Sequence, residues 1–285
     1  MPEIRPAATV IVLRDTLAGP EVFMVRRHHA IAFMAGSHVF PGGRVEDSDR
    51  VADSSWCDAL LEARAKMPGV GPDDAVSFQV AAARELFEEA GVLLARQSTG
   101  APLSLADAAD QERFRDHRAE LNAGRRTFQD VIVSERLRVA LDALVPYAYW
   151  VTPPLDIRRF DTRFFATRVP HEQTPVHDDG ESTDSMWIMP ADAIAAAGRE
   201  EIMLPPPTWA TLRELERFAS VEAALAWAGT RTVYRREPKM LDQTAGNGAR
   251  RLILPGDPSL PEPEPVAFET RFVETNGRWV PETDR

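Results

Sequence analysis

The chain has 285 residues, enough for one elaborated domain or for two. Its apolar fraction of 44% and charged fraction of 27% are typical of a soluble globular protein, and its net charge of −11 argues against a general nucleic-acid or anionic-membrane surface. Cys57 is the only cysteine, which excludes an intrachain disulfide.

The first part of the chain predicts a β-hairpin followed by a glycine turn. The apolar run at residues 7–13 predicts a buried strand, residues 15–20 a turn, and residues 21–25 the returning strand. A second punctuated segment follows at Phe40-Pro41-Gly42-Gly43. Its glycines permit tight turning and a close approach of the backbone to a ligand.

Residues 75–90 predict a helix with an acidic stripe, capped by Asp73 or Asp74. A helix turns about 100° per residue, so acids three and four positions apart share one face. Like charges at this spacing oppose helix formation by roughly 0.2–0.5 kcal/mol per pair, and a bound cation relieves them. Carboxylate oxygens suit Mg²⁺ or Mn²⁺, whereas a solvated acidic face is the simpler alternative. The stripe consists of Glu85, Glu88 and Glu89.

The later part of the chain mixes helical and strand patterns. Residues 105–121 and 131–144 predict two helices, which we expect to cap a pocket or to form a dimer surface. Strands are predicted at residues 147–151, 164–169, 182–188, 266–273 and 278–280, and helices at residues 56–64, 191–197, 209–218 and 221–227.

The acidic helix and the glycine turn together resemble the signature box of the Nudix hydrolases. The stretch from Arg84 to Val92 fills the second half of the box, and Gly43 is similar to its opening glycine. The family places the arginine 14 positions after that glycine, whereas Arg84 lies 41 positions after Gly43, so residues 50–77 are an insertion. A box split in this way is similar to the subgroup of the mammalian peroxisomal coenzyme A diphosphatase and its bacterial relatives.

The resemblance implies an α/β fold, the Nudix α/β/α sandwich with a mixed sheet. It implies a Nudix domain over residues 1–218, with the box-splitting insertion 50–77 and a helical insertion at 101–144. Residues 219–285 are then a C-terminal extension packed on the core or on a partner subunit.

The resemblance also implies roles for the residues of the box. Metal ligands would be Glu88, Glu89 and the Gly42 carbonyl, with Mg²⁺ or Mn²⁺ as cofactor. Glu85 would be a further ligand or the group that deprotonates water, and Arg84 would orient it. Asp49, a shorter acid than the family's first glutamate, would be an outer contact.

Residues outside the acidic helix complete the candidate site. Nudix enzymes often use one more acid, for which Glu181 ranks first and Glu172 and Asp178 are alternatives. The simpler alternative for each of the three is an acid on a solvated loop without a role in the site. Five residues are candidates for binding the substrate, although each could instead have a purely structural role. They are Arg26, Arg27, His38, Phe40 and Gly43.

The resemblance implies hydrolysis of coenzyme A or acyl-coenzyme A to 3′,5′-ADP and a phosphopantetheine product. Ala32 stands where other coenzyme A enzymes of the family carry an arginine, so nucleotide sugars, dinucleotides and nucleoside triphosphates stay open as substrates. A catalytically inactive binding module is a further alternative. We expect a small-molecule diphosphate substrate, no nucleic-acid or membrane partner, and a possible homodimer. A cytoplasmic location is expected because the chain shows neither a signal-peptide layout nor a long apolar run.

Overall fold

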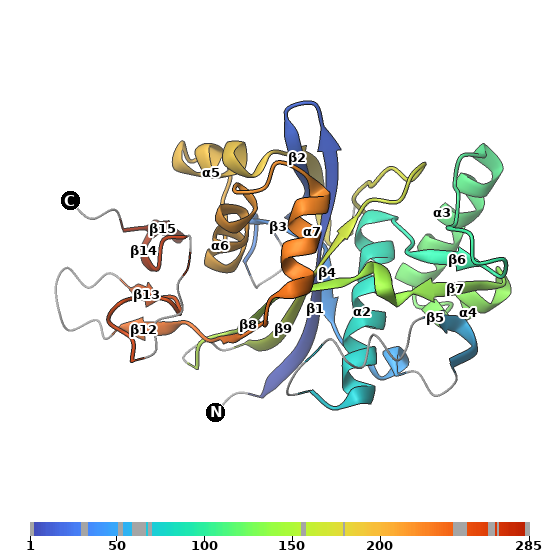
Figure 1. Ribbon diagram of the computed structural model, residues 1–285, viewed down its shortest axis with the longest axis horizontal. Coiled ribbons are helices and arrows are strands. Elements are labelled where there is room, and N and C mark those ends of the chain that lie inside the picture. The colour runs from blue at the N-terminus through green and yellow to red at the C-terminus, as the bar shows by residue number, and fades with distance from the viewer. Residues whose placement is uncertain are drawn as a thin grey trace.

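The computed structural model describes residues 3–29, 34–50, 54–58, 67, 70–154, 158–178, 180–241, 250–261, 266 and 268–282. A central mixed sheet has the order β10-β2-β1-β9-β8-β11 and lies between helical layers (Figure 1). Its strands are β1 (Ile4–Thr16), β2 (Gly19–Arg27), β8 (Val145–Val151), β9 (Arg159–Arg168), β10 (Ser182–Ile188) and β11 (Arg235–Arg236). Two short strands, β3 (His38–Val39) and β4 (Gly42–Arg44), pair with β2 and β1.

Strand β1 shows why the sheet is covered on both faces. Side chains of a strand alternate between its two faces. Val10 and Val12 belong to the core cluster that packs against α2, whereas Ile11 and Leu13 belong to the cluster on the opposite face. All four side chains are fully buried, so the near-continuous apolar run is what a strand between two layers requires. The sandwich predicted from the resemblance is confirmed.

Helix α2 (Pro72–Ala90) carries the acidic stripe and covers one face of the sheet (Figure 1). The predicted cap is wrong: Gly71 is the N-cap, without a side-chain hydrogen bond. Asp73 and Asp74 lie in the first turn, where negative charge favours the helix dipole. The helix ends at Gly91, whose φ of 68° is left-handed, a conformation that glycine adopts without strain.

Segments on both sides of α2 in the sequence form a small layer beyond this helix. Helices α3 (Ala108–Asn122) and α4 (Phe128–Ser134) accompany a three-stranded sheet of β5 (Cys57–Asp58), β6 (Ala95–Gln97) and β7 (Leu137–Ala140). The helix predicted at 131–144 is therefore wrong in its second half. In the helix predicted at 56–64, Trp56 ends a 3-10 helix and Cys57–Asp58 is strand β5, whereas residues 59–66 lie outside the described residues.

The other face of the central sheet carries the C-terminal elements. Helices α5 (Pro190–Gly198), α6 (Pro206–Leu215) and α7 (Val221–Thr230) lie there, as Figure 1 shows. They are joined by a four-stranded C-terminal sheet, β12 (Lys239–Leu241), β13 (Arg251–Ile253), β14 (Arg271–Thr275) and β15 (Arg278–Pro281). Within the described ranges, no helix is both long and apolar enough to cross a membrane.

Candidate active site

The buried guanidinium of Arg84 organises the acids of the box. Its Nε and Nη2 donate to the two carboxylate oxygens of Asp49 at 2.8 and 2.9 Å. Nη1 donates to Glu85 at 2.9 Å and to Glu88 at 2.7 Å, and Nη2 also reaches the Arg44 carbonyl at 2.8 Å. Only the planar fork of arginine presents enough donors for all of these acceptors. Asp49, an expected outer contact, is thus the bidentate partner that anchors Arg84.

The glycine turn approaches the same helix from the sheet. Gly43 pairs with Ala8 in β1, and its Cα lies beneath the Glu85 carboxylate, so an added Cβ would stand 2.5 Å from an oxygen. The Gly42 N–H donates to Glu89 Oε2 at 2.8 Å. Gly42 has φ of 156° and no room for a Cβ against the Ala8 carbonyl. The two glycines therefore let the turn sit directly on the acids.

Burial and neighbouring charges raise the pKa values of the carboxyl groups in this cluster. Burial raises the pKa of Glu85 to about 8; Arg84 opposes this shift, and the charges of Glu88 and Glu181 add to it. Burial and the Glu85 charge hold the pKa of Glu89 well above its usual range, against the Gly42 N–H and Arg27. Both carboxyl groups therefore favour the neutral form, and a positive charge placed among them would favour their ionised form.

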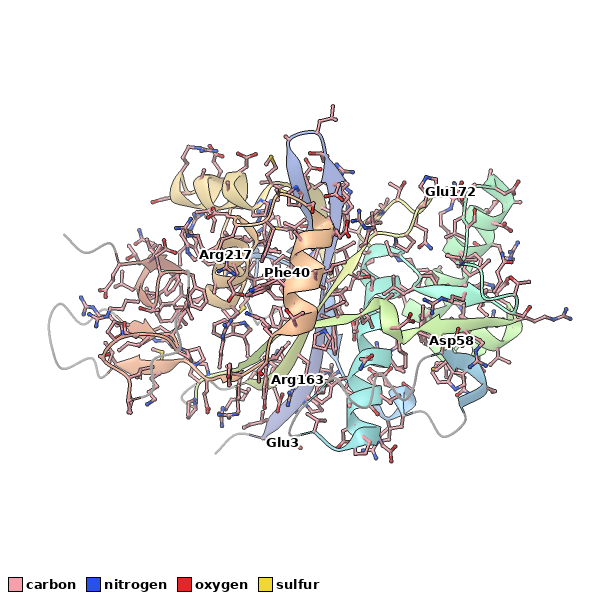
Figure 2. All side chains as sticks on the ribbon, viewed as in Figure 1. Glu3, Phe40, Asp58, Arg163, Glu172 and Arg217 are labelled. Carbon is pink, nitrogen blue, oxygen red and sulfur yellow. The ribbon has the colours of Figure 1, made fainter. Side chains whose placement is uncertain are left out.

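Glu181 is the acid outside the box that the structure brings to this cluster. It acts electrostatically on both Glu85 and Glu89 and lines the same pocket. Asp178 instead accepts hydrogen bonds from the backbone N–H groups of Glu181 and Ser182. Glu172 accepts a hydrogen bond from Ser104 and lies beside α3, far from Phe40 (Figure 2).

The donor set of the cluster suits a divalent cation. Its oxygens are those that Mg²⁺ and Mn²⁺ prefer, and a cation would offset both the burial and the neighbouring charges that raise the carboxyl pKa values. Among the residues that the structure describes, no three His, Cys, Asp or Glu side chains converge as a ready ligand set. Glu88 is engaged by Arg84 and Glu89 by the Gly42 N–H. The residues therefore fit a metal by the chemistry of their oxygens, while one oxygen each of Glu88 and Glu89 accepts a hydrogen bond from a protein donor.

A pocket of about 1030 Å³ opens from the acids across the sheet edge. Its box end is lined by Gly42, Gly43, Glu85 and Glu88, whereas Glu89 lies behind Gly42. The remaining wall comes from β8, β9, the start of α6 and the C-terminal sheet. Such a volume lies at the upper end of the range for small-molecule sites, roughly 300–1,000 Å³.

The predicted substrate residues divide between this pocket and its surroundings. Arg27, Phe40 and Gly43 line the pocket. Arg26 and His38 pair across β2 and β3 and are absent from its lining, so the structure does not place them at a substrate. Burial, together with the charge of Arg26, lowers the pKa of His38 to about 4, which keeps the ring neutral. Ala32 lies outside the described residues.

Several pocket residues were not anticipated from the sequence. They are contributed by segments whose place in space depends on tertiary packing. They include Glu46, Asn122, Arg158, Pro205, Met240, Leu252 and Trp279.

An arginine-held acidic helix, a glycine turn and a mixed sheet between helical layers together define a Nudix hydrolase. Residues 63–217 match the family model described as the NUDT19 Nudix domain. The chain therefore belongs to the Nudix hydrolases, in the group that this domain describes.

Two curated proteins and one solved structure illustrate the relationship. The human acyl-coenzyme A diphosphatase NUDT19 is 32% identical over 71% of this chain, which spans 62% of the human protein's length. The Gallus gallus protein of the same name is 30% identical, with 91% of this chain and 78% of that protein covered. The crystal structure of a NUDIX hydrolase from Alicyclobacillus acidocaldarius has a TM-score of 0.67 at 29% identity, covering 79% of this chain and 97% of that one.

Proposed function

We propose that the protein hydrolyses the diphosphate linkage of coenzyme A or acyl-coenzyme A. The observation that carries the proposal is one pocket of about 1030 Å³ that joins the box acids to a long, largely apolar wall. A diphosphate alone would fill little of this space, whereas coenzyme A has long groups on both sides of its diphosphate. The names of the human and Gallus gallus relatives support this substrate class.

Glu88, Glu89 and the Gly42 carbonyl would hold Mg²⁺ or Mn²⁺, with Glu85 as a further ligand or as the base. A bound cation neutralises phosphate oxygens and lowers the pKa of water. In the reaction, a water oxygen bonds to one phosphorus and the bond from that phosphorus to the bridging oxygen breaks. The bridging oxygen leaves with the other phosphate, giving 3′,5′-ADP and phosphopantetheine or its acyl ester.

The chain's own groups position these events. Arg84 fixes the Glu85 carboxylate at 2.9 Å, so that it can take the proton of the attacking water. Arg27 lines the pocket beside the acids and would face the phosphates of the substrate. The intact helix acids, Glu85, Glu88 and Glu89, argue against the inactive binding module. Nucleotide sugars, dinucleotides and nucleoside triphosphates remain the alternative substrates, and a homodimer remains a prediction.

The variant Glu89→Gln tests the assignment. The amide oxygen can still accept the Gly42 N–H bond, which is 2.8 Å long in the wild type, so the fold should persist. We expect coenzyme A turnover with Mn²⁺ to fall by about 100-fold or more. The matched control, Asp74→Asn at the exposed first turn of α2, should keep wild-type turnover. Unchanged hydrolysis by a folded Glu89→Gln protein would reject the role of Glu89.

A further inference from the structure

The C-terminal sheet presents one apolar face to the pocket. Met240 pairs with Leu252 across β12 and β13, and Leu252 pairs with Phe272 across β13 and β14. Directly paired residues share a face, and so do residues two apart along a strand. Trp279, two residues before the partner of Phe272 in β15, therefore lies on this same face. Met240, Leu252 and Trp279 all line the pocket.

This face is held rigidly on the core of the molecule. The Trp209 ring in α6 packs edge-on against Phe272 with a centroid distance of 6.3 Å. Its Nε1 donates to Glu269 Oε2 at 2.7 Å. On the sheet side, Trp150 of β8 packs against Phe268 at 6.4 Å. Because buried aromatic contacts already order this wall, it loses little conformational entropy when a ligand binds, and it can therefore discriminate between ligands.

The pocket wall changes character away from the acids. Its lining from β8, β9, α6 and the C-terminal sheet is dominated by apolar groups, including Trp150, Phe164 and Leu204. Among the described lining residues of this part, charge is carried by Arg158, Arg250 and Glu274, and the last two are paired at 3.0 Å. Such a surface favours a flexible hydrocarbon chain over another phosphate.

We propose that Met240, Leu252 and Trp279 form the subsite for the acyl chain of an acyl-coenzyme A. The inference depends on the proposed function and deepens it: the C-terminal sheet, not the Nudix box, sets the preference for chain length. The groups of free coenzyme A occupy the parts of the pocket nearer the acids and do not reach these three side chains, whereas a long acyl thioester extends onto them.

The variants Met240→Ser and Trp279→Ser test the subsite. Each removes apolar contact, so kcat/KM for lauroyl-coenzyme A should fall about tenfold while kcat/KM for free coenzyme A changes by less than about twofold. The ratio of the two values within one preparation does not depend on the folded fraction, so partial unfolding cannot imitate the result.

The opposite face of the same sheet offers matched controls. Leu241 and Val280 directly follow Met240 and Trp279, and they are 41% and 43% exposed. Leu241→Ser and Val280→Ser should leave the lauroyl-coenzyme A to coenzyme A ratio unchanged.

The possible failures are distinguishable. An equal loss on both substrates would overturn the subsite, because the wall would then contact the part that they share. An unchanged ratio in both pocket variants would also overturn it, while leaving the diphosphatase intact. If the wild-type protein cleaves no coenzyme A compound at all, the proposed function fails and the subsite fails with it.

Discussion

Arg84 is the residue on which the geometry of the acids depends. Its side chain is 5% exposed and joins Asp49, Glu85 and Glu88. A buried cation among carboxylates is held in place because removing any partner would leave a charge without compensation. The arginine therefore fixes the positions of acids that would otherwise repel one another.

Replacing the two glycines of the turn by alanine should affect different properties, turnover for Gly43 and stability for Gly42. In Gly43→Ala the new Cβ meets the Glu85 carboxylate, the movable end of a side chain. In Gly42→Ala it meets the Ala8 carbonyl and the Thr9 Cα, which are backbone. We expect Gly43→Ala to lower kcat by about tenfold or more with little change in stability. We expect Gly42→Ala to lower the free energy of unfolding by about 1–3 kcal/mol.

Turnover and urea unfolding, measured on both glycine variants, check this contrast. Gly100→Ala supplies a comparison, because its left-handed φ of 86° is strained for alanine although its surroundings are open. Equal losses of turnover and of stability in Gly43→Ala and Gly42→Ala would contradict the different clashes.

The sequence predicted the spacing of the box residues, whereas Arg27, Phe40 and Glu181 were candidates that only the fold brings to the pocket. The helical stripe of Glu85, Glu88 and Glu89 followed from periodicity, and its union with the glycine turn followed from the resemblance. Arg26 and His38 pair across β2 and β3 and do not line the pocket, whereas their neighbours Arg27 and Val39 do, because strand residues alternate between faces. The pairing of strands, which decides the face, is a tertiary property that these residues do not encode alone.

At the scale of elements, helix α3 supports the end of the box helix. Arg118 in α3 donates through Nε to the Glu88 carbonyl at 2.8 Å, and Asn122 donates to the same oxygen at 3.3 Å. Carbonyls in the last turn of a helix lack partners within the helix, so donors from another element fix its end. Helix α3 therefore fixes the backbone of Glu88, whose side chain is one of the proposed metal ligands.

Replacing Arg118 should loosen this end of α2. We expect Arg118→Met to lower kcat about tenfold and to raise the Mn²⁺ concentration needed for half-maximal rate, and Arg118→Lys to restore part of both. Arg115→Met, at an exposed position of α3, is the matched control. Wild-type Mn²⁺ dependence in a folded Arg118→Met protein would show that α3 does not position the acids.

One element, strand β7, was predicted wrongly from the local sequence pattern. The run at 131–144 has apolar residues at helical spacing, yet Leu137–Ala140 is strand β7. Pairing on both sides, with β5 and β6, outweighs the local periodicity. Both partners, at Cys57–Asp58 and Ala95–Gln97, are distant from β7 in the sequence, so no local signal could predict the three-stranded sheet.

At the scale of the whole molecule, the C-terminal sheet completes the pocket. A buried carboxylate, Asp257, organises the loop between β13 and β14. It accepts bonds from Arg271 Nε at 2.8 Å, from Thr270 Oγ1 at 2.9 Å and from the Ser259 N–H at 2.9 Å. The bond from Arg271 is the main reason why the pKa of Asp257 lies far below its usual range.

This depressed pKa predicts a pH-dependent contribution to stability. The ionised form of Asp257 is favoured in the folded protein, so its contribution is fully present above the unfolded value of about 3.9 and is lost as pH falls. Asp257→Asn should lower the free energy of unfolding by about 2 kcal/mol at pH 7, and the difference should shrink progressively below about pH 4.

Thermal and urea unfolding at pH 7 and pH 3 measure that difference. Asp142→Asn is the control, because Asp142 and Arg96 form an exposed pair whose loss should cost less than about 1 kcal/mol. A difference between wild type and Asp257→Asn that stays constant from pH 7 to pH 3 would argue against the ionised carboxylate as its source.

The central claim is that the box acids and the long pocket act together on coenzyme A. Its most direct test is the relative kcat/KM of the wild-type protein, with Mn²⁺, for coenzyme A, lauroyl-coenzyme A, ADP-ribose, UDP-glucose, diadenosine tetraphosphate and ATP, with products identified by chromatography. We predict that the products are 3′,5′-ADP together with phosphopantetheine or its acyl ester. We also predict that kcat/KM for the two coenzyme A compounds is at least about tenfold above kcat/KM for the four substrates that lack coenzyme A. Intact coenzyme A beside rapid cleavage of another diphosphate would contradict it.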